Sequence, residues 1–423
     1  MFRIHAKLLI PGHGQPVPDG VVVLDGDRIH YAGAQAAAPV ADEAEESVRV
    51  PVVMPGMWDC HTHFAGLRDG VSTERLVLTG AEVAIARSVR DAEVALRAGF
   101  TSVRELGGYG IYLARAIDEG TLPGPSIYAA GRLIGPTGGH SDAHSLPYAW
   151  VADPRRTQGM LQIADGVDEC LRAVRLQLRL GARVIKVCTS GGVISEVDHP
   201  GHQQFSTDEL RAIVEEAARA ERVVAAHCHG RAGILAALEA GCRTIEHGTE
   251  IDADIAAAMR ESGAILVPTR TVYEGFLARK DMLPPAAVRK LEEVADRHRA
   301  ALVTAHEAGV RIAAGTDLGV CASDSPLAWG RHGAEFAHLV AAGLDPLAAI
   351  EAGTATAPLT LGPQAPRSGR LAAGYDADVL ALSANPLDDI GVLARPEAIT
   401  HVWKGGALVK TPAAQDLPEL AKG

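Results

Sequence analysis

Residues 52–63 read VVMPGMWDCHTH, an apolar run that ends in two histidines separated by one residue. In a β-strand, residues i and i+2 lie on the same face, so the side chains of His61 and His63 can reach the same ligand. Ionisable side chains also follow or end later apolar runs, namely Lys186, His227, His247 and Asp317. This pattern indicates a parallel sheet whose strands end in reactive groups.

The central part of the chain alternates between short β-rich runs and helical stretches, which is typical of βα units around a parallel sheet. Eight apolar runs are expected to be strands: 52–61, 101–106, 126–134, 183–189, 222–228, 244–248, 264–269 and 311–317. The stretches 167–181 and 207–220 are expected to be helices, and Ser206 with Glu209 forms a capping box before the second. We therefore predict the α/β class, with a (β/α)8 TIM barrel over residues 55–367. In such a barrel, active sites lie at the carboxyl ends of the strands.

Both ends of the chain are expected to form β-hairpins. GVVVLDGDRIHYAG (20–33) contains Asp25-Gly26, and ITHVWKGGALVK (399–410) contains Gly405-Gly406, each a turn signal between two apolar runs. Small isolated β-segments are hard to stabilise, so we expect the two ends to pack together. The prediction is a small β-sandwich domain built from residues 1–54 and 368–423.

Composition excludes several classes of protein. Forty Lys and Arg residues against 52 Asp and Glu residues give a net charge of −12, and no basic run marks a nucleic-acid partner. No stretch approaches the roughly 20 apolar residues that span a bilayer, and the start MFRIHAKLLIPGHGQ is too polar for a signal peptide. The six cysteines form no CxxC motif, which suits reduced thiols. We expect a cytoplasmic protein with neither nucleic-acid nor membrane partners.

Taken singly, each reactive residue has an ordinary explanation. A histidine at a strand end can be satisfied by backbone groups, and Asp317 can cap the next helix. Lys186 lies inside a strand that should be buried, where an ammonium is costly unless it is paired or modified. The occurrence of these side chains at the ends of successive strands favours a shared metal site.

The order of these motifs resembles that of the amidohydrolase superfamily over nearly the full chain, and in particular its imidazolonepropionase-like branch. The matching segments are HTH (61–63), IKV (185–187), TSGGV (189–193), HCHG (227–230), IEHG (245–248), GTD (315–317) and GRLAAGYDADVL (369–380), with GPTGGHSD (135–142) typical of the branch. The branch contains zinc dipeptidases and carboxypeptidases that cleave Xaa-Arg or Xaa-Pro substrates, and relatives that hydrolyse N-acyl amino acids and ochratoxin. True imidazolonepropionases lack a bridging lysine, so Lys186 favours the peptidase-like side.

The resemblance implies a binuclear metal centre. His61, His63 and Asp317 would hold one ion, His227 and His247 would hold the other, and a carbamate formed from CO2 on Lys186 would bridge them. Zinc is the expected metal, although this ligand set also suits Mn, Fe or Co. Two divalent ions would acidify a shared water, and Asp317 would act as general acid and base, passing the proton to the leaving nitrogen.

Substrate-binding residues are less defined by the sequence. His140 and His229 are candidates for stabilising an oxyanion or holding the substrate, and each also suits a role in orienting a metal ligand. Arg270 and Arg331 could each bind a carboxylate through two hydrogen bonds. Tyr273 is a further candidate substrate-binding residue.

The expected metal centre carries net positive charge, which favours a substrate with a free carboxylate such as a dipeptide, an N-acyl amino acid or an ochratoxin-like amide. Asp198 and Asp324 could instead recognise a basic side chain, which keeps Xaa-Arg and Xaa-Lys substrates open. Two other readings also remain: a cyclic-amide hydrolase or ring deaminase of the same superfamily, and a non-catalytic barrel that binds metal or small molecules. Similar proteins are commonly homo-oligomers, often octamers, so a homo-oligomer acting on a small-molecule substrate is expected.

Overall fold

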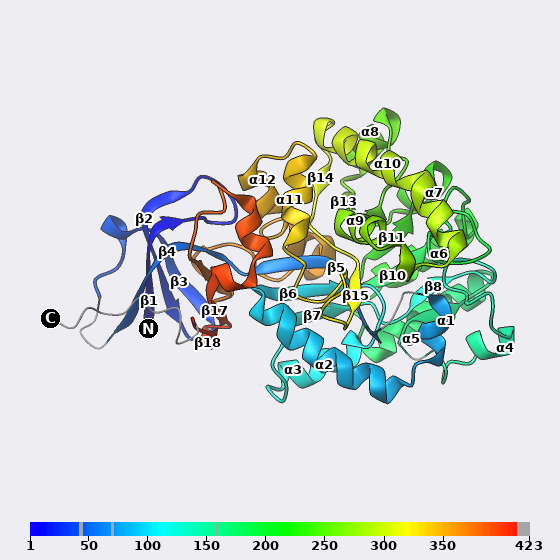
Figure 1. The fold of residues 1–423 in the computed structure, drawn as a ribbon, viewed down its shortest axis with the longest axis horizontal. Helices are drawn as coiled ribbons and strands as arrows, with labels where there is room; N and C mark the ends of the chain where they lie inside the picture. Colours follow the sequence, from blue (N-terminus) through cyan, green and yellow to red (C-terminus); the bar gives the residue numbers. More distant parts are fainter. Residues whose placement is uncertain (42–44, 69–71, 158, 413–423) are drawn as a thin grey trace.

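The structure is a computed structural model that describes residues 1–41, 45–68, 72–157 and 159–412. Its strands are β1 (Phe2–Leu9), β2 (Val17–Asp25), β3 (Arg28–Ala34), β4 (Glu46–Pro55), β5 (Met57–Leu67), β6 (Phe100–Glu105), β7 (Ser126–Ala129), β8 (Leu133–Gly135), β9 (Leu161–Ile163), β10 (Ile185–Cys188), β11 (Val224–Cys228), β12 (Thr244–His247), β13 (Ile265–Val267), β14 (Arg311–Ile312), β15 (Leu318–Val320), β16 (Val379–Leu382), β17 (Ile399–Lys404) and β18 (Ala407–Lys410). Its α-helices are α1 (Thr73–Leu78), α2 (Ala81–Arg97), α3 (Gly110–Asp118), α4 (Tyr148–Val151), α5 (Val167–Leu180), α6 (Thr207–Ala218), α7 (Arg231–Ala240), α8 (Ala253–Ser262), α9 (Arg270–Ala278), α10 (Pro285–Glu307), α11 (Ala334–Ala341) and α12 (Pro346–Ala352). Figure 1 shows the strand-rich ends of the chain at one end of the molecule and the alternating strands and helices at the other.

Strands from the two ends of the chain form one seven-stranded sheet in the order β18-β17-β16-β4-β1-β2-β3. Strands β1 and β4 are parallel, and the other neighbours are antiparallel. Both expected hairpins are present, and Gly26, Gly405 and Gly406 adopt the positive φ that their turns require. The strands of the two chain ends thus form one hydrogen-bonded sheet, and its arrangement as a β-sandwich stays a prediction. The limits 1–54 and 368–423 stay a prediction, and residues 413–423 lie outside the described part of the chain.

A separate apolar core holds this terminal sheet together. Ile4, Leu24, Val53, Val379 and Trp403 come from five of its strands and share one buried cluster. The two chain ends are therefore joined by side-chain packing as well as by backbone hydrogen bonds.

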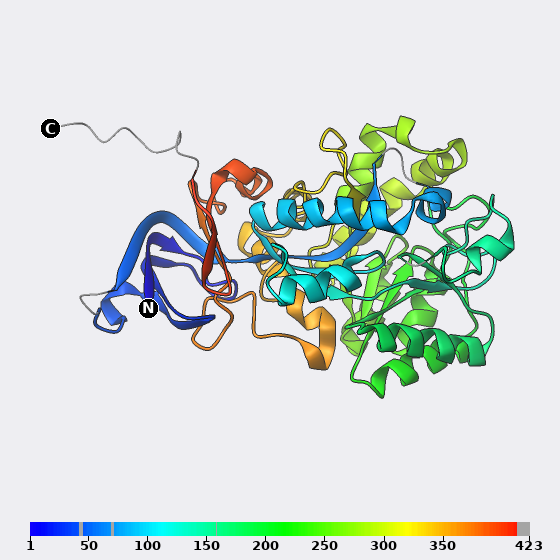
Figure 2. The same ribbon diagram turned by 90° about the horizontal axis from the view of Figure 1, so that it is seen from below.

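The central strands form two parallel sheets, β14-β13-β12-β11-β10-β8-β9 and β15-β5-β6-β7. Each of the eight runs expected to be strands overlaps at least one strand. The run 126–134 differs from the expectation because Gly131, with φ +77°, separates β7 from β8, and these two strands belong to different sheets. The helices lie outside the strands in both views (Figure 1, Figure 2).

Backbone hydrogen bonds connect the two central sheets at two separate places. The N–H of Arg183, just before β10, donates to the carbonyl of Ala129 in β7 at 2.8 Å. The N–H of Cys60 in β5 donates to the carbonyl of Ala314, just after β14, at 2.9 Å. The carboxyl ends of the strands in both sheets therefore face a common region.

Helices α5 and α6 begin at Val167 and Thr207, where the sequence predicts them. At the start of α6, the Ser206 hydroxyl accepts from the N–H of Glu209, and the Glu209 carboxylate accepts from the N–H of Ser206. Helix α10 begins at Pro285, whose missing N–H would have no partner in the first turn anyway.

Within the described residues, no helix is long and apolar enough to cross a membrane. All six cysteines are free thiols and five are buried. Cys60 and Cys228 belong to two apolar clusters, as expected for packing residues.

The packing of the terminal core leads to a first prediction, on the stability of the protein. Ile4 is fully buried, so Ile4→Ala should reduce the free energy of unfolding by about 2–5 kcal/mol and lower the thermal midpoint. Leu408→Ala in β18, where the side chain is 46% exposed, is the matched control and should change the midpoint little. Equal shifts for the two variants in a thermal unfolding experiment would contradict this account of the core.

Candidate active site

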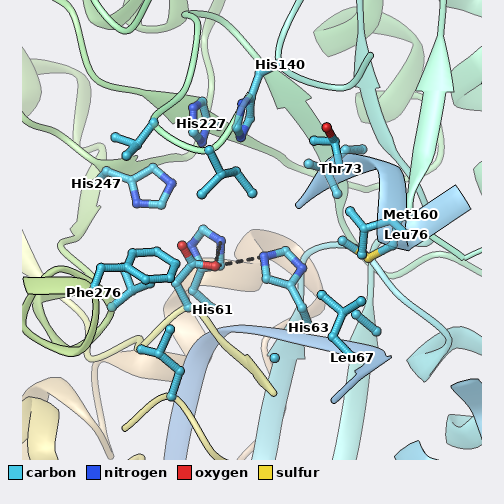
Figure 3. Close-up of a pocket in the computed structure, with 18 of the residues that line it drawn as sticks. His61, His63, Leu67, Thr73, Leu76, His140, Met160, His227, His247 and Phe276 are labelled. Carbon is cyan, nitrogen blue, oxygen red and sulfur yellow. Dashed lines mark ion pairs between the residues drawn. The ribbon is translucent and has the colours of Figure 1, made fainter. Parts of the chain in front are cut away.

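The six residues proposed from the sequence as metal ligands line one pocket, in four strands and just before a fifth (Figure 3). His61 and His63 lie in β5, Lys186 in β10, His227 in β11 and His247 at the end of β12, while Asp317 immediately precedes β15. The pocket has an empty volume of about 1010 Å³. The structure therefore brings together the six side chains that the sequence pattern singled out.

Asp317 lies next to both histidines of β5. Its Oδ1 is 2.9 Å from His63 Nε2 and 3.6 Å from His61 Nε2, and its N–H donates to the carbonyl of His61 at 2.7 Å. Burial alone would raise the pKa of Asp317, but the neighbouring His61 and His63 lower this pKa to about 2. Asp317 is a carboxylate at neutral pH.

A buried ion pair orients His61. The Nδ1 of His61 donates to Glu246 Oε2 at 2.8 Å, and Arg104 Nη2 donates to Glu246 Oε1 at 2.7 Å. Arg104 also donates to the carbonyl of Cys60 and to the hydroxyl of Thr244. Burial would raise the pKa of Glu246, but Arg104 and His61 lower it to about 2. This ionised Glu246 fixes the proton of His61 on Nδ1 and leaves Nε2 free.

The other histidines also use one ring nitrogen for hydrogen bonds within the protein. His63 Nδ1 donates to the carbonyl of Gly107 at 2.8 Å, and His227 Nε2 donates to the carbonyl of Gly191 at 3.3 Å. His247 Nδ1 lies 2.8 Å from the hydroxyl of Thr269. Each ring therefore keeps its other nitrogen for a ligand, as metal-binding histidines do.

These atoms fit a metal site. His63 is protonated on Nδ1, so its Nε2 carries a lone pair. This Nε2 lies 2.9 Å from a carboxylate oxygen of Asp317, which also carries lone pairs. Two such atoms repel each other at this distance unless a cation or a proton lies between them. Two groups in the described chain have ligand atoms within 4.8 Å of one another: His61 with His247 and Asp317, and His227 with His229 and His247. Burial also lowers the pKa of His227 and of His247 well below the usual value, which keeps both rings neutral.

His229 lies closer to the proposed ligands than the sequence indicated. Its ring contacts that of His247 at a centroid distance of 4.8 Å, and its Nδ1 lies 2.8 Å from the Thr249 hydroxyl and 3.1 Å from the Tyr273 hydroxyl. Its other nitrogen is therefore a further candidate ligand atom, in addition to the substrate-binding role considered above.

Lys186 is only 1% exposed, and its Nζ lies 3.5 Å from His61 Nε2. Burial lowers the pKa of Lys186. No carboxylate in the described part of the chain forms an ion pair with it within 4.0 Å, so burial disfavours the charged ammonium without a direct ion pair to offset this.

The predicted substrate-binding residues divide into two groups. His140, His229 and Tyr273 line the pocket. Arg270 is turned away from it, because its guanidinium donates to Glu274 and to the carbonyl of Ala295, and Arg331 is an exposed residue outside the lining.

The outer wall of the pocket is apolar. Its apolar residues are Ala65, Leu67, Leu76, Leu133, Met160, Leu161, Val193, Ile194, Val272, Phe276, Leu291, Val320 and Leu327, and Thr73 adds one hydroxyl to the lining. Lys186 and Asp317 are the charged side chains among the described lining residues, apart from histidine, and neither Asp198 nor Asp324 belongs to the lining. A polar floor therefore lies below walls suited to an apolar ligand.

Comparison with known proteins gives the class of this chain. Residues 52–409 match the amidohydrolase family, so the chain belongs to the amidohydrolase family and is a hydrolase acting on C–N bonds. It is 46% identical over 423 aligned residues to ochratoxinase of Aspergillus niger, covering 97% of this chain and 86% of the relative.

Solved structures agree with this assignment. A crystal structure of A. niger ochratoxinase superposes with a TM-score of 0.90 at 45% identity, covering 97% of this chain and 96% of that one. A prolidase complexed with N-methylphosphonate-L-proline superposes with a TM-score of 0.87 at 32% identity, covering 97% and 99%. These neighbours imply a (β/α)8 barrel with an accessory β domain.

The Arg104–Glu246 pair gives a second prediction. Arg104→Met should leave a buried carboxylate without its cation and destabilise the fold by about 3–5 kcal/mol, seen as a lower thermal midpoint. Arg104→Met combined with Glu246→Gln should recover part of this loss, because the uncompensated charge is gone. Arg115→Met, at an exposed pair on α3, is the control. A double variant no more stable than Arg104→Met would contradict the assigned cause.

Proposed function

We propose that this protein is a metal-dependent amidohydrolase that cleaves the amide bond of an apolar substrate bearing a free carboxylate, such as an N-acyl amino acid or an ochratoxin-like amide. The observation that carries the proposal is a pocket whose floor holds histidines, Lys186 and Asp317 and whose walls are apolar. The similarity to a protein named ochratoxinase supports the same substrate class.

Two divalent ions, with zinc as the expected metal, would be held by the ligand set already proposed. His61, His63 and Asp317 would hold one ion, and His227 and His247 the other. Metal ions in such a site polarise a carbonyl and make a water available as a nucleophile near neutral pH. The buried side chain of Lys186, whose pKa is lowered by burial, would add to CO2 in its deprotonated form: its nitrogen would bond to the carbon and release a proton, and the resulting carbamate would be an anionic metal ligand.

Asp317 is the residue placed to move protons. Its carboxylate is ionised at neutral pH and lies on the pocket floor, where it would accept a proton from the attacking water and deliver it to the leaving nitrogen. Glu246 and Arg104 would act indirectly, because they hold His61 in its orientation.

The apolar walls favour an apolar group on the substrate over a basic one. Asp198 is engaged with Ser195 and Lys290, and Asp324 lies away from this pocket, so neither is placed to bind a lysine or arginine side chain. The Xaa-Arg reading is therefore the less favoured one.

We also propose that the two central sheets form one closed (β/α)8 barrel. The hydrogen bonds from Arg183 to Ala129 and from Cys60 to Ala314 support closure, because they join the two sheets at two separate places.

The substrate class is tested with metal-replete enzyme on a panel containing N-benzoyl-phenylalanine, N-benzoyl-lysine, ochratoxin A and an Xaa-Pro dipeptide. We expect kcat/KM for the phenylalanine compound to exceed that for the lysine compound by about 10-fold or more, because the apolar walls would desolvate an ammonium. N-benzoyl-phenylalanine amide, which lacks the carboxylate, is the control and should be poorer. Equal rates for the apolar and basic compounds would exclude this account of specificity.

The metal centre is tested by counting bound metal in the same samples. The wild type should bind two ions per chain, and Lys186→Ala should lose at least one of them and reduce kcat/KM by roughly 100-fold or more. Lys280→Ala, at an exposed residue, is the control. Full activity and two ions in Lys186→Ala would rule out the bridging role, and one ion in the wild type would favour the cyclic-amide or deaminase reading.

A further inference from the structure

His140 lines the active-site pocket and is one end of a chain of hydrogen bonds. It follows β8, and its ring stacks on that of His227 with a centroid distance of 4.2 Å and an interplanar angle of 16°. Figure 3 shows the rings of His140 and His227 side by side, across the pocket from His61 and His63. His140 Nδ1 lies 2.9 Å from the hydroxyl of Ser195, which is fully buried.

The far end of this chain is the Asp198 carboxylate. It accepts hydrogen bonds from the N–H of Gly192 at 2.9 Å, from Gln204 Nε2 at 3.1 Å and from Lys290 Nζ at 3.4 Å. The amide of Gln204 has its orientation fixed because its Oε1 accepts from the N–H of His140 at 3.1 Å. Asp198 is thus surrounded by donors, as an ionised carboxylate requires.

Ser195 links Asp198 to His140, and its single hydroxyl proton decides the direction of the chain. The hydroxyl donates to Asp198 Oδ1 in a close contact, while the alternative acceptor, the carbonyl of Gly192, is 3.4 Å away. An ionised carboxylate cannot donate in return. The remaining lone pair of Ser195 therefore accepts from His140, and the proton of His140 lies on Nδ1.

This direction has a consequence for the other ring nitrogen. A neutral imidazole carries one N–H, so Nε2 of His140 keeps a lone pair. Within the described residues, Nε2 has no hydrogen-bond partner. It can accept a hydrogen bond from a ligand, but it cannot donate one to an oxyanion, the role first considered for His140.

A bound secondary amide would supply the missing donor. Its N–H leaves water when it enters a pocket with apolar walls, and an unpaired N–H there is costly. His61, His63, His227 and His247 have their remaining nitrogens directed to the proposed metal site, and the Tyr273 hydroxyl is shared with Thr249 and His229. His140 Nε2 is thus one acceptor on the pocket wall, beside the Thr73 hydroxyl and the second ring nitrogen of His229, and it is the one that the hydrogen-bond chain holds without a proton.

We propose that Ser195 and Asp198 are positioning residues that hold His140 as the Nδ1–H tautomer, and that His140 Nε2 accepts a hydrogen bond from the N–H of the scissile amide. The ligand in this inference rests on the proposed amide hydrolysis, whereas the tautomer does not. The inference narrows the substrate class to secondary amides, since an Xaa-Pro bond has no N–H to offer.

The tautomer is measured on zinc-loaded enzyme with 15N-labelled histidine, with the His140 signals identified by their absence in His140→Gln. We expect a protonated Nδ1 and a bare Nε2, which resonate in well-separated regions of the 15N spectrum. A protonated Nε2 in the wild type would overturn the proposal. This result can be read whether or not the enzyme hydrolyses any amide, so it separates failure of the proposal from failure of the proposed function.

The positioning role is tested with Asp198→Asn. An asparagine amide can donate to Ser195, which frees the serine hydroxyl to donate to His140, so the proton should move to Nε2. Glu196→Gln, an exposed acid in the same segment, is the control and should keep the wild-type tautomer. An unchanged spectrum in Asp198→Asn would overturn the assigned chain. If that variant does not fold, Ser195→Ala replaces it and should abolish the single fixed tautomer.

The substrate contact is tested with an amide and the ester of the same acyl and leaving groups. Relative to the wild type, Asp198→Asn and His140→Ala should lose roughly 10-fold more kcat/KM on the amide than on the ester, because the ester has no N–H. Comparing each substrate with its own wild-type rate removes the higher intrinsic reactivity of the ester. Equal losses of kcat/KM on the amide and on the ester would show that His140 does not accept a hydrogen bond from the N–H, and would overturn that part of the proposal.

Discussion

The buried ion pair between Arg104 and Glu246 is the interaction on which the rest of the site depends. Both side chains are fully buried, and removing two charges from water is costly unless their hydrogen bonds are satisfied. Here Arg104 contacts Glu246, Thr244 and the carbonyl of Cys60, while Glu246 also accepts from His61. The pair thus links β5, β6 and β12. One network both holds the strands together and sets the orientation of a proposed metal ligand.

A second constraint acts on the backbone at the ends of the strands. His247, Thr269 and Asp317 have φ values of +68°, +56° and +63°, a region that residues other than glycine rarely adopt. Such conformations cost about 1–3 kcal/mol each and persist where the surrounding structure enforces them. Here the hydroxyl of Thr269 meets His247, and the N–H of Asp317 meets the carbonyl of His61. Three of the six non-glycine residues with positive φ in the described part of the chain therefore lie at the strand ends around the pocket.

The sequence could predict the parts of this site that follow from strand periodicity. His61 and His63 share a face because they are two residues apart, and Lys186, His227 and His247 end or interrupt apolar runs. The sequence did not single out Glu246, because it lies within a strand directly before His247 and belongs to no regular pattern of polar residues. Arg270 was misjudged for a related reason: its position after a strand suggested the pocket, but Glu274, four residues along the same helix, draws its guanidinium away. Contacts between residues far apart in sequence, such as Ser195 with His140, have no local signal.

The segment after β10 contributes both to the apolar wall of the pocket and to the hydrogen bonds that orient His140. Val193 and Ile194 supply part of the apolar wall, and the next residue, Ser195, contacts His140. Lys290 of α10 donates to the carbonyls of Gly192 and Ser195 and to Asp198, so one cation fixes both the wall and the hydrogen-bond chain. A change that moved this segment to admit a larger substrate would also move the acceptor on His140. The shape of the wall and the polarity of the contact to the scissile amide are therefore constrained to vary together.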